Sequence, residues 1–331
     1  MMYYIESSNT DPYRNLALEQ VIFDRLDPDM DHFMLWQNKN AIIVGKHQNT
    51  SEEINASFVK EHGINVARRL SGGGAVYHDL GNINFTFIRS SGNERGLDFS
   101  FFCEPVKEVL RTFGVPVELS GRNDMTVEGM KFSGNAQYIK GGRVMHHGTI
   151  LYDSDLSMLS KALKPGTDKI ESRGIKSVRG RVTNIRPYMK EDMSVADFRE
   201  ALRDRLAGAF DLRKISLEPE HNAAVDELRD SLYARWAWNY GNSPPHNVRK
   251  ARRFEGCGKI EVFLDIGQEG IIKNIAFYGD FFSSRDPAEL CGMLTSCHLE
   301  YSELKAALAG TDVSRYFNAL DGEAFLELLL E

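Results

Sequence analysis

Short apolar runs separated by polar turns dominate the first half of the chain. Such runs are typical of strands, because consecutive buried positions or a period of two mark extended segments. The pattern predicts strands over 3–6, 32–36, 41–44, 64–67, 83–88, 115–119 and 125–127, and over 143–145 leading into 146–151. Strands that follow one another without regular intervening helices favour a mixed or antiparallel sheet over alternating βαβ units.

Other segments repeat apolar residues every three or four positions, which predicts helices with one buried face. They span about 12–26, 102–113, 198–210 and 219–233. Asp11 and Pro12 are residue types preferred at the N-cap and the first position of the first helix. Thr50 and Glu53 have the spacing of a capping box, so we expect one helix from Thr50 to about residue 62, ended by Gly63.

An aromatic and proline-containing stretch, residues 236–245, marks a boundary along the chain. Beyond it, 259–266 and 270–278 alternate well enough for a hairpin, and helical patterns begin at Asp286, Ser302 and Gly322. We therefore expect an α+β fold of two domains. The large one, residues 1–245, has helices flanking a mixed or antiparallel sheet, and the small one, residues 246–331, is also α+β.

The amino-acid composition limits the class of protein and the cellular compartment that we expect. The 331 residues carry a formal net charge of −7, which argues against a general nucleic-acid binder. The four cysteines form no Cys-x-x-Cys pair, so free thiols in a reducing compartment are expected rather than a zinc site. We find no basic leader segment and no apolar run of membrane-spanning length, and we expect a cytoplasmic protein with no membrane partner.

Residues 68–87 hold the most distinctive chemistry of the chain. Arg68 and Arg69 precede Gly72, Gly73 and Gly74, and a strand-like run follows. Glycine lets the backbone approach a ligand closely, and a row of free amides next to an arginine suits a phosphate or a carboxylate. A glycine-rich hairpin turn is the structural alternative, and three glycines alone would favour it.

Three other polar clusters punctuate the predicted strands. They are Asn123-Asp124 with Lys131, the segment 146–149, and the basic segment 164–187. Each cluster can also be interpreted without a function, as a turn, a solvated lysine, a structural histidine or a solvated loop. We interpret the basic segment as a mobile flap, because a long loop within a compact domain is usually functional or disordered. The chain has no Gly-x-x-x-x-Gly-Lys-Ser/Thr sequence and no dinucleotide fingerprint to compete for phosphate.

Together these motifs resemble those of the lipoate–protein ligases, which belong to the lipoyltransferase and biotin ligase superfamily. The matching segments are 15–19, 68–82, 121–124, 131–136, 146–151, 176–184 and 238–244. The resemblance covers nearly the whole chain and implies a class II synthetase-like fold. It also implies a two-step reaction, in which ATP and lipoate give lipoyl-AMP and the acyl group then passes to a lysine of a lipoyl-carrier protein.

The resemblance also implies roles for individual residues. Lys131 matches the essential lysine that contacts both the acyl carbonyl oxygen and the α-phosphate. The implied ATP- and adenylate-binding residues are Arg69, Gly74, Ala75, Val76, Tyr77, Asn123, Asp124 and Lys131. The implied lipoate pocket comprises Ser71, Gly72, Gly73, His78, Asn82, His147, Gly148 and Thr149. Lys176, Arg179 and Arg181 match a mobile adenylate loop.

Cofactors and partners follow from the same resemblance. ATP is expected with Mg²⁺ bound through its phosphates, and the protein ligands of the metal are not defined. The expected acceptors are the H protein of glycine cleavage and the acyltransferase subunits of 2-oxoacid dehydrogenases, and the enzyme is expected to act as a monomer. Two alternatives stay open: an ATP-independent octanoyl or lipoyl carrier transferase, and a non-catalytic regulator on the same scaffold.

Overall fold

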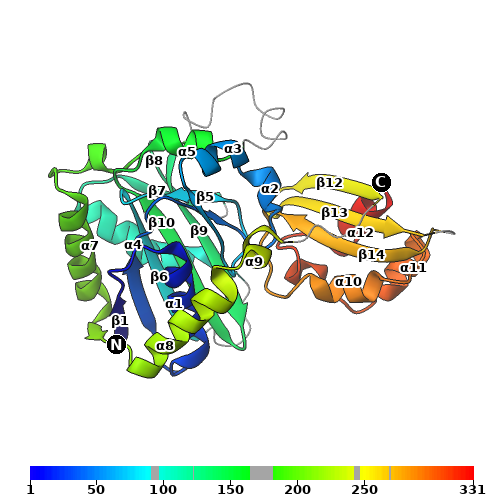
Figure 1. The fold of residues 1–331 in the computed structure, drawn as a ribbon, viewed down its shortest axis with the longest axis horizontal. Helices are drawn as coiled ribbons and strands as arrows, with labels where there is room; N and C mark the ends of the chain where they lie inside the picture. The colour runs from blue at the N-terminus through cyan, green and yellow to red at the C-terminus, as the bar shows by residue number, and fades with distance from the viewer. Residues whose placement is uncertain (91–96, 122, 165–181, 242–246, 268–269) are drawn as a thin grey trace.

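The computed structural model describes residues 1–90, 97–121, 123–164, 182–241, 247–267 and 270–331, and Figure 1 shows how they are arranged. A large body carries the long strands, and a smaller body lies beside it. The smaller body is formed by the described residues from 247 to the end of the chain. No helix in these ranges is both long and apolar enough to cross a membrane.

The large body is built on an eight-stranded sheet of order β11-β1-β2-β6-β10-β9-β8-β7. The strands are β1 (Met2–Glu6), β2 (His32–Trp36), β6 (Asn82–Ser90), β7 (Val117–Ser120), β8 (Asp124–Val127), β9 (Met130–Lys140), β10 (Arg143–Leu151) and β11 (Leu212–Ile215). β1 runs parallel to β2 and β11, whereas the remaining neighbours are antiparallel. The predicted mixed sheet flanked by helices is confirmed.

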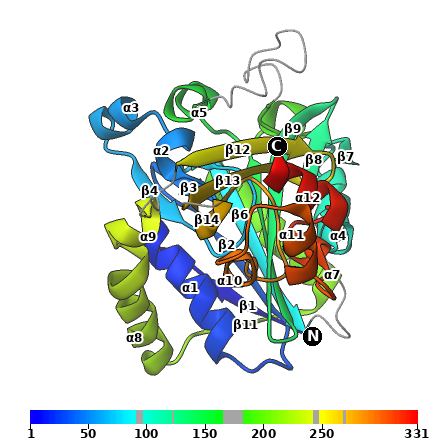
Figure 2. The same cartoon turned by 90° about the vertical axis from the view of Figure 1, so that its right-hand side faces the viewer.

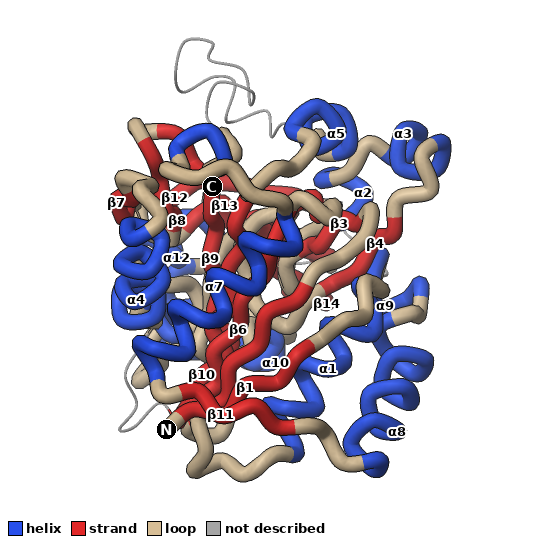
Figure 3. Tube along the Cα trace, turned by 90° about the vertical axis from the view of Figure 1, so that its left-hand side faces the viewer, coloured by secondary structure: helices blue, strands red, loops and turns tan. Residues whose placement is uncertain are grey.

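Helices cover both faces of this sheet, as Figures 2 and 3 show from opposite sides. On one face α4 (Phe99–Thr112) and α7 (Val195–Phe210) bury their apolar sides against the strands. On the other face lie α1 (Pro12–Arg25) and α8 (Pro219–Leu228), which a π-helical turn (Arg229–Tyr233) continues. Each of these helices has one apolar face, formed by residues that recur every three or four positions along the chain. This repeat is visible in the sequence, so it predicted the helices.

A small second sheet has the order β4-β3-β5 and lies beside the first. Its strands are β3 (Ala41–Val44), β4 (Asn65–Arg68) and β5 (Val76–His78). The loop between β4 and β5, residues 69–75, contains the three consecutive glycines and is called the glycine loop below. Short helices α2 (Thr50–Glu53), α3 (Ala56–Glu61) and α5 (Leu156–Ala162) surround this sheet.

The single helix predicted from Thr50 to residue 62 is wrong. The chain forms α2 and α3, with a break at Ile54, whose backbone bridges to Leu163. Thr50 caps nothing, because its hydroxyl donates to the carbonyl of Asn239 at 2.6 Å and accepts from Arg68 at 2.7 Å. Tertiary hydrogen bonds therefore override the local capping pattern.

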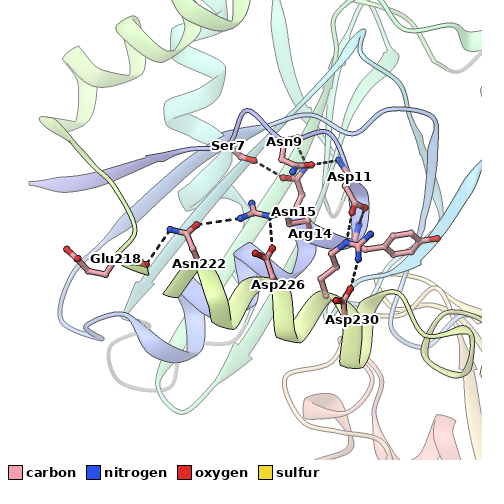
Figure 4. Close-up of polar contacts among 11 residues, drawn as sticks. Ser7, Asn9, Asp11, Arg14, Asn15, Glu218, Asn222, Asp226 and Asp230 are labelled. Atoms are coloured by element: carbon pink, nitrogen blue, oxygen red, sulfur yellow. Dashed lines mark hydrogen bonds and ion pairs between the residues drawn. The ribbon is translucent and has the colours of Figure 1, made fainter. Parts of the chain in front are cut away.

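Polar contacts fix the N-terminus of α1, as Figure 4 shows. The carboxylate of Asp11 accepts from the backbone N–H of Tyr13 at 3.0 Å, as its predicted N-cap role requires. Arg14 pairs with Asp226 of α8 at 2.9 Å, and the hydroxyl of Ser7 donates to Asn15 at 2.8 Å. The helix that these contacts anchor carries the buried side chain of Glu19.

The smaller body has its own sheet and core. Its strands are β12 (Val248–Phe254), β13 (Gly258–Ile266) and β14 (Ile272–Gly279), and the predicted β13–β14 hairpin is confirmed. The helices are α10 (Ala288–Leu294), α11 (Tyr301–Ala307) and α12 (Gly322–Leu330). A 3₁₀ turn (Val313–Arg315) also belongs to this body, whereas α9 (Trp236–Tyr240) and a 3₁₀ turn (Arg186–Tyr188) precede it in the chain. The core of this body is separate from the two cores that flank the main sheet.

Candidate functional site

Two neighbouring cavities open where the small sheet, β9, β10 and the end of β14 come together. Cavity A has a volume of about 260 Å³ and cavity B of about 220 Å³. Seven residues line both cavities and so form the passage between them: Gly74, Ala75, Val76, Lys131, Gly134, Thr149 and Asp280. A ligand with two chemically different ends could occupy both cavities at once.

Lys131 is the cation of this passage. β8 and β9 change register between Met125 and Thr126, and such a bulge re-aims the side chains next to it. A methyl group at Gly134 would lie 3.1 Å from Nζ of Lys131, so the glycine leaves room for the ammonium group. Nζ pairs with Oδ1 of Asp124 at 2.7 Å, and the side chain is 38% exposed, so an incoming anion can compete for it.

Arg68 organises the backbone around the glycine loop rather than binding a ligand itself. Its guanidinium group donates to the carbonyls of Gly45, Lys46, Gln48, Trp238 and Asn239. A further bond reaches the hydroxyl of Thr50 at 2.7 Å. Burial lowers the pKa of Arg68 to about 10, so the group remains a cation near neutral pH.

Arg69 also acts within the loop. Nη2 donates to the carbonyls of Gly72 at 2.6 Å and Gly74 at 2.9 Å, and thereby fixes the curve of the loop. Burial lowers its pKa to about 10, and the nearby Glu19 carboxylate opposes that shift. Arg69 lines cavity B, but most of its donors are already occupied by the protein.

A buried hydrogen-bonded chain connects Arg69 to α1. Nε of Arg69 donates to the hydroxyl of Ser71 at 3.0 Å, and that oxygen lies 2.6 Å from Nε2 of His147. Nδ1 of His147 lies 3.1 Å from the Glu19 carboxylate. With Nδ1–H donating to Glu19, Nε2 is free to accept the hydroxyl proton of Ser71. The chain therefore couples the shape of the glycine loop to a carboxylate on α1.

The far end of cavity B combines apolar walls with polar atoms that lack protein partners. Leu16, Trp36 and Ile43 supply apolar surface. Within the described part of the chain, no protein atom pairs with Nε2 of His78 or with Nδ2 of Asn84. Nδ1 of His78 accepts from Asn38 at 3.1 Å, which places the proton of the neutral ring on Nε2. Burial, then the charge of Arg69, lowers the pKa of His78 to about 3.

The structure brings most of the residues predicted for the site to one place. Cavity A is lined by Gly74, Ala75, Val76, Tyr77, Asn82, Lys131 and Thr149. Cavity B is lined by Arg69, Gly73, Gly74, Ala75, Val76, His78, Asn123, Asp124, Lys131, His147, Gly148 and Thr149. Two predicted pocket residues, Ser71 and Gly72, line neither cavity. Lys176, Arg179 and Arg181 lie outside the described residues.

Sequence reasoning missed the contribution of the smaller body. Arg253, Lys259, Glu261 and Asp280 line cavity A, and Phe282 lines cavity B. The alternation of β13 and β14 predicts a hairpin but does not indicate which body it faces. Gly134 was within reach of sequence analysis, because it lies three residues after Lys131 on the same strand.

The cysteines provide no nucleophile at this site. Cys103 is buried on α4, and Sγ lies 3.9 Å from Nε2 of His146. Burial raises the pKa of its thiol to about 12, so the thiolate needed for attack is scarce near neutral pH. Cys103 lines neither cavity.

Comparison with known proteins agrees with this geometry. A family model described as the lipoyl protein ligase A/B catalytic domain matches residues 11–207. A second, described as the bacterial lipoate protein ligase C-terminus, matches residues 243–329. The chain is 40% identical over 335 residues to the lipoate-protein ligase LplJ of Bacillus subtilis, covering 99% of this chain and 100% of that protein.

Solved structures show the same architecture. The crystal structure of P. falciparum LipL1 in complex with lipoate has a TM-score of 0.79 and 24% identity, covering 100% of this chain and 98% of that one. The crystal structure of lipoate-protein ligase A bound with ATP has a TM-score of 0.61 and 27% identity. That similarity covers 73% of this chain and 99% of the other.

Proposed function

This chain belongs to the lipoate–protein ligase family, and from that premise we propose how its two cavities serve the reaction. The protein is an ATP-dependent ligase that joins lipoate to a lysine of a lipoyl-carrier protein through lipoyl-AMP. Cavity B holds the acyl chain, and cavity A holds the nucleotide. The observation that carries this assignment is that Lys131 lines both cavities, where a carboxylate from one would meet a phosphate from the other.

In the first step a lipoate carboxylate oxygen attacks the α-phosphorus of ATP, and the bond to pyrophosphate breaks. Negative charge grows on the α-phosphate oxygens, next to the ammonium group of Lys131. Lipoate would displace Asp124 as the partner of that group, since the present Lys131–Asp124 pair is 2.7 Å long and only partly buried. One oriented donor of this kind is typically worth about 3–4 kcal/mol of transition-state stabilisation.

In the second step the amine of the carrier lysine attacks the carbonyl carbon of lipoyl-AMP. The amide bond forms, AMP leaves, and the amine loses its proton. Charge develops on the carbonyl oxygen, so the same Lys131 ammonium group can stabilise it. No protein nucleophile is required, which agrees with the buried, weakly acidic thiol of Cys103.

The glycine loop is proposed to receive the phosphates and the adenylate ribose. Gly74, Ala75 and Val76 form the wall common to both cavities. A methyl group at Gly74 would meet no atom within 4 Å, so its backbone faces open space that a ligand can enter. Tyr77, which lines cavity A, is proposed as a further adenylate contact. Asn123 and Asp124 line cavity B, and they are proposed to reach the adenylate where the cavities meet, because Asp124 pairs there with Lys131.

Magnesium fits this arrangement as a companion of ATP. No cluster of three or more His, Cys, Asp or Glu side chains that could hold a metal occurs among the described residues. Magnesium commonly needs only one or two carboxylates besides substrate phosphates, and Asp124 lies within cavity B beside Lys131. When bound with ATP, the ion would neutralise phosphate charge and favour departure of pyrophosphate.

Lipoate and a lipoyl domain are the substrates. We propose that the acceptors include the H protein of glycine cleavage and the acyltransferase subunits of 2-oxoacid dehydrogenases, and that the enzyme acts as a monomer in the cytoplasm. The free cysteines support a reducing compartment.

We also propose residues 1–245 as the catalytic domain and residues 246–331 as an accessory domain, and the separate apolar core of the smaller body supports that division.

A reconstituted reaction tests the proposed function. The purified protein is mixed with ATP, magnesium chloride, lipoate and an apo lipoyl domain, and the acceptor is weighed by mass spectrometry. We expect a mass increase equal to one lipoyl group that requires both ATP and lipoate. Modification without ATP from an acylated carrier would instead identify a transferase, and no modification under any condition would overturn the proposal.

A further inference from the structure

Residues 279–283, which begin at the last residue of β14, lie directly against the glycine loop. The backbone N–H of Gly73 donates to the carbonyl of Phe281 at 3.2 Å. The backbone N–H of Gly279 donates to the carbonyl of His47 at 2.8 Å, and the ring of His47 stacks on Phe281 with centroids 4.7 Å apart. A main-chain bond thus joins the smaller body to the loop between β4 and β5, and a second main-chain bond and the ring stacking join it to the segment after β3.

Two of the three consecutive glycines are needed for this contact. A Cβ atom at Gly72 would lie 2.3 Å from the carbonyl oxygen of Phe281, which is closer than real side-chain atoms approach. A Cβ atom at Gly73 would lie 2.8 Å from the ring of Phe282. Gly72 lines neither cavity, so its lack of a side chain serves the contact with residues 279–283 rather than a ligand.

Phe282 extends this contact into cavity B. Its side chain is 1% exposed and packs with Phe99 of α4 and Ala136 of β9. The rings of Phe99 and Phe282 have centroids 5.1 Å apart. Phe282 and Ala136 both line cavity B. Phe282 does not line cavity A, so the smaller body contributes an aromatic wall to the acyl side alone.

We propose that Phe282 is a specificity-determining residue for the acyl substrate, held in place by Gly72 and Gly73. This inference rests on the proposed function, because it takes cavity B as the acyl pocket. An aromatic ring at the wall of an apolar pocket provides contact area for an alkyl chain or a dithiolane ring. The acyl pocket is therefore complete only when residues 279–283 lie on the glycine loop.

The test is lipoate-dependent exchange between pyrophosphate and ATP, measured for the wild type and for Phe282→Ala, Phe282→Leu and Gly72→Ala. Phe282→Ala removes apolar contact, so we expect the KM for lipoate to rise about tenfold. Phe282→Leu should give a smaller rise. Gly72→Ala should also raise the KM for lipoate, because it displaces Phe281 and with it Phe282. The KM for ATP should change by less than about twofold in all three.

Two matched substitutions control for general damage. Phe325→Leu trims a buried ring in the core of the smaller body, away from both cavities. Gly208→Ala adds a methyl group on α7 where no atom lies within 4 Å. Both should leave the KM for lipoate unchanged, and thermal unfolding of every variant shows whether it is folded.

The outcomes separate this inference from the function on which it rests. An unchanged KM for lipoate in folded Phe282→Ala and Phe282→Leu, with active wild type, would overturn the role of Phe282 alone. Equal increases in the KM for lipoate and for ATP would also overturn it, since they would indicate a general structural effect. Absence of lipoate-dependent exchange in the wild type would overturn the proposed function together with this inference.

Discussion

Buried polar side chains give the acyl side of the site its character. His78 is 3% exposed and remains neutral, because burial and then the nearby guanidinium group of Arg69 lower the pKa of its ring. The residue lines cavity B, and its buried Nε2–H has no protein partner among the described residues. Sequence analysis placed His78 in the pocket through a family resemblance. Its protonation state depends on packing across several strands and could not be read from the sequence.

The low pKa of His78 leads us to predict that the protein becomes less stable as the pH falls. A histidine in the unfolded chain has a pKa of about 6.5, whereas that of His78 in the folded protein is about 3. Below pH 6.5 the unfolded state therefore binds a proton that the folded state does not, and stability falls as the pH is lowered toward 3. In urea titrations between pH 6 and pH 4, His78→Asn should lose less free energy of unfolding than the wild type, by about 1.4 kcal/mol per pH unit.

The exposed His62 provides the control, since His62→Asn changes a surface residue. Identical pH slopes for the wild type and His78→Asn would show that a neutral, buried His78 does not contribute to acid sensitivity.

Among the elements, β4 ends in an arginine, Arg68, whose hydrogen-bond partners the sequence did not indicate. The arginine pair suggested an anion site. The guanidinium group of Arg68, however, donates hydrogen bonds to five backbone carbonyls and to the hydroxyl of Thr50. Those carbonyls belong to segments far apart in sequence, so no local pattern could identify them. By contrast, Asp11 and Pro12 correctly predicted the start of α1, because a helix N-cap depends on neighbours along the chain.

Replacing Arg68 should therefore destabilise the fold rather than only weaken nucleotide binding. Arg68→Met would leave several buried carbonyls without a donor, which we expect to reduce the free energy of unfolding by at least about 3 kcal/mol. Arg14→Met, which removes the partly exposed pair with Asp226, should cost no more than about 1 kcal/mol. Chemical denaturation measures both variants. A loss below about 1 kcal/mol for Arg68→Met would contradict the structural role.

At the scale of the whole molecule, the site is assembled from parts that the sequence keeps far apart. The mixed sheet, the hairpin of the smaller body and the position of Lys131 near Asp124 were all predictable, because each follows from periodicity or from a compact motif. The contact between residues 279–283 and the glycine loop was not, since backbone bonds such as Gly73 to Phe281 leave no mark in composition. The division at residue 245 stays a prediction.

The central claim is that adenylation occurs where the two cavities meet at Lys131. Its most direct test is lipoate-dependent pyrophosphate exchange by Lys131→Ala, with circular dichroism to check folding. Lys140→Ala, on the same strand with a side chain that is 64% exposed, is the matched control. We predict that Lys131→Ala loses lipoyl-AMP formation by about 10²–10³-fold or more while Lys140→Ala retains it. Substantial adenylate formation by a folded Lys131→Ala protein would contradict the account.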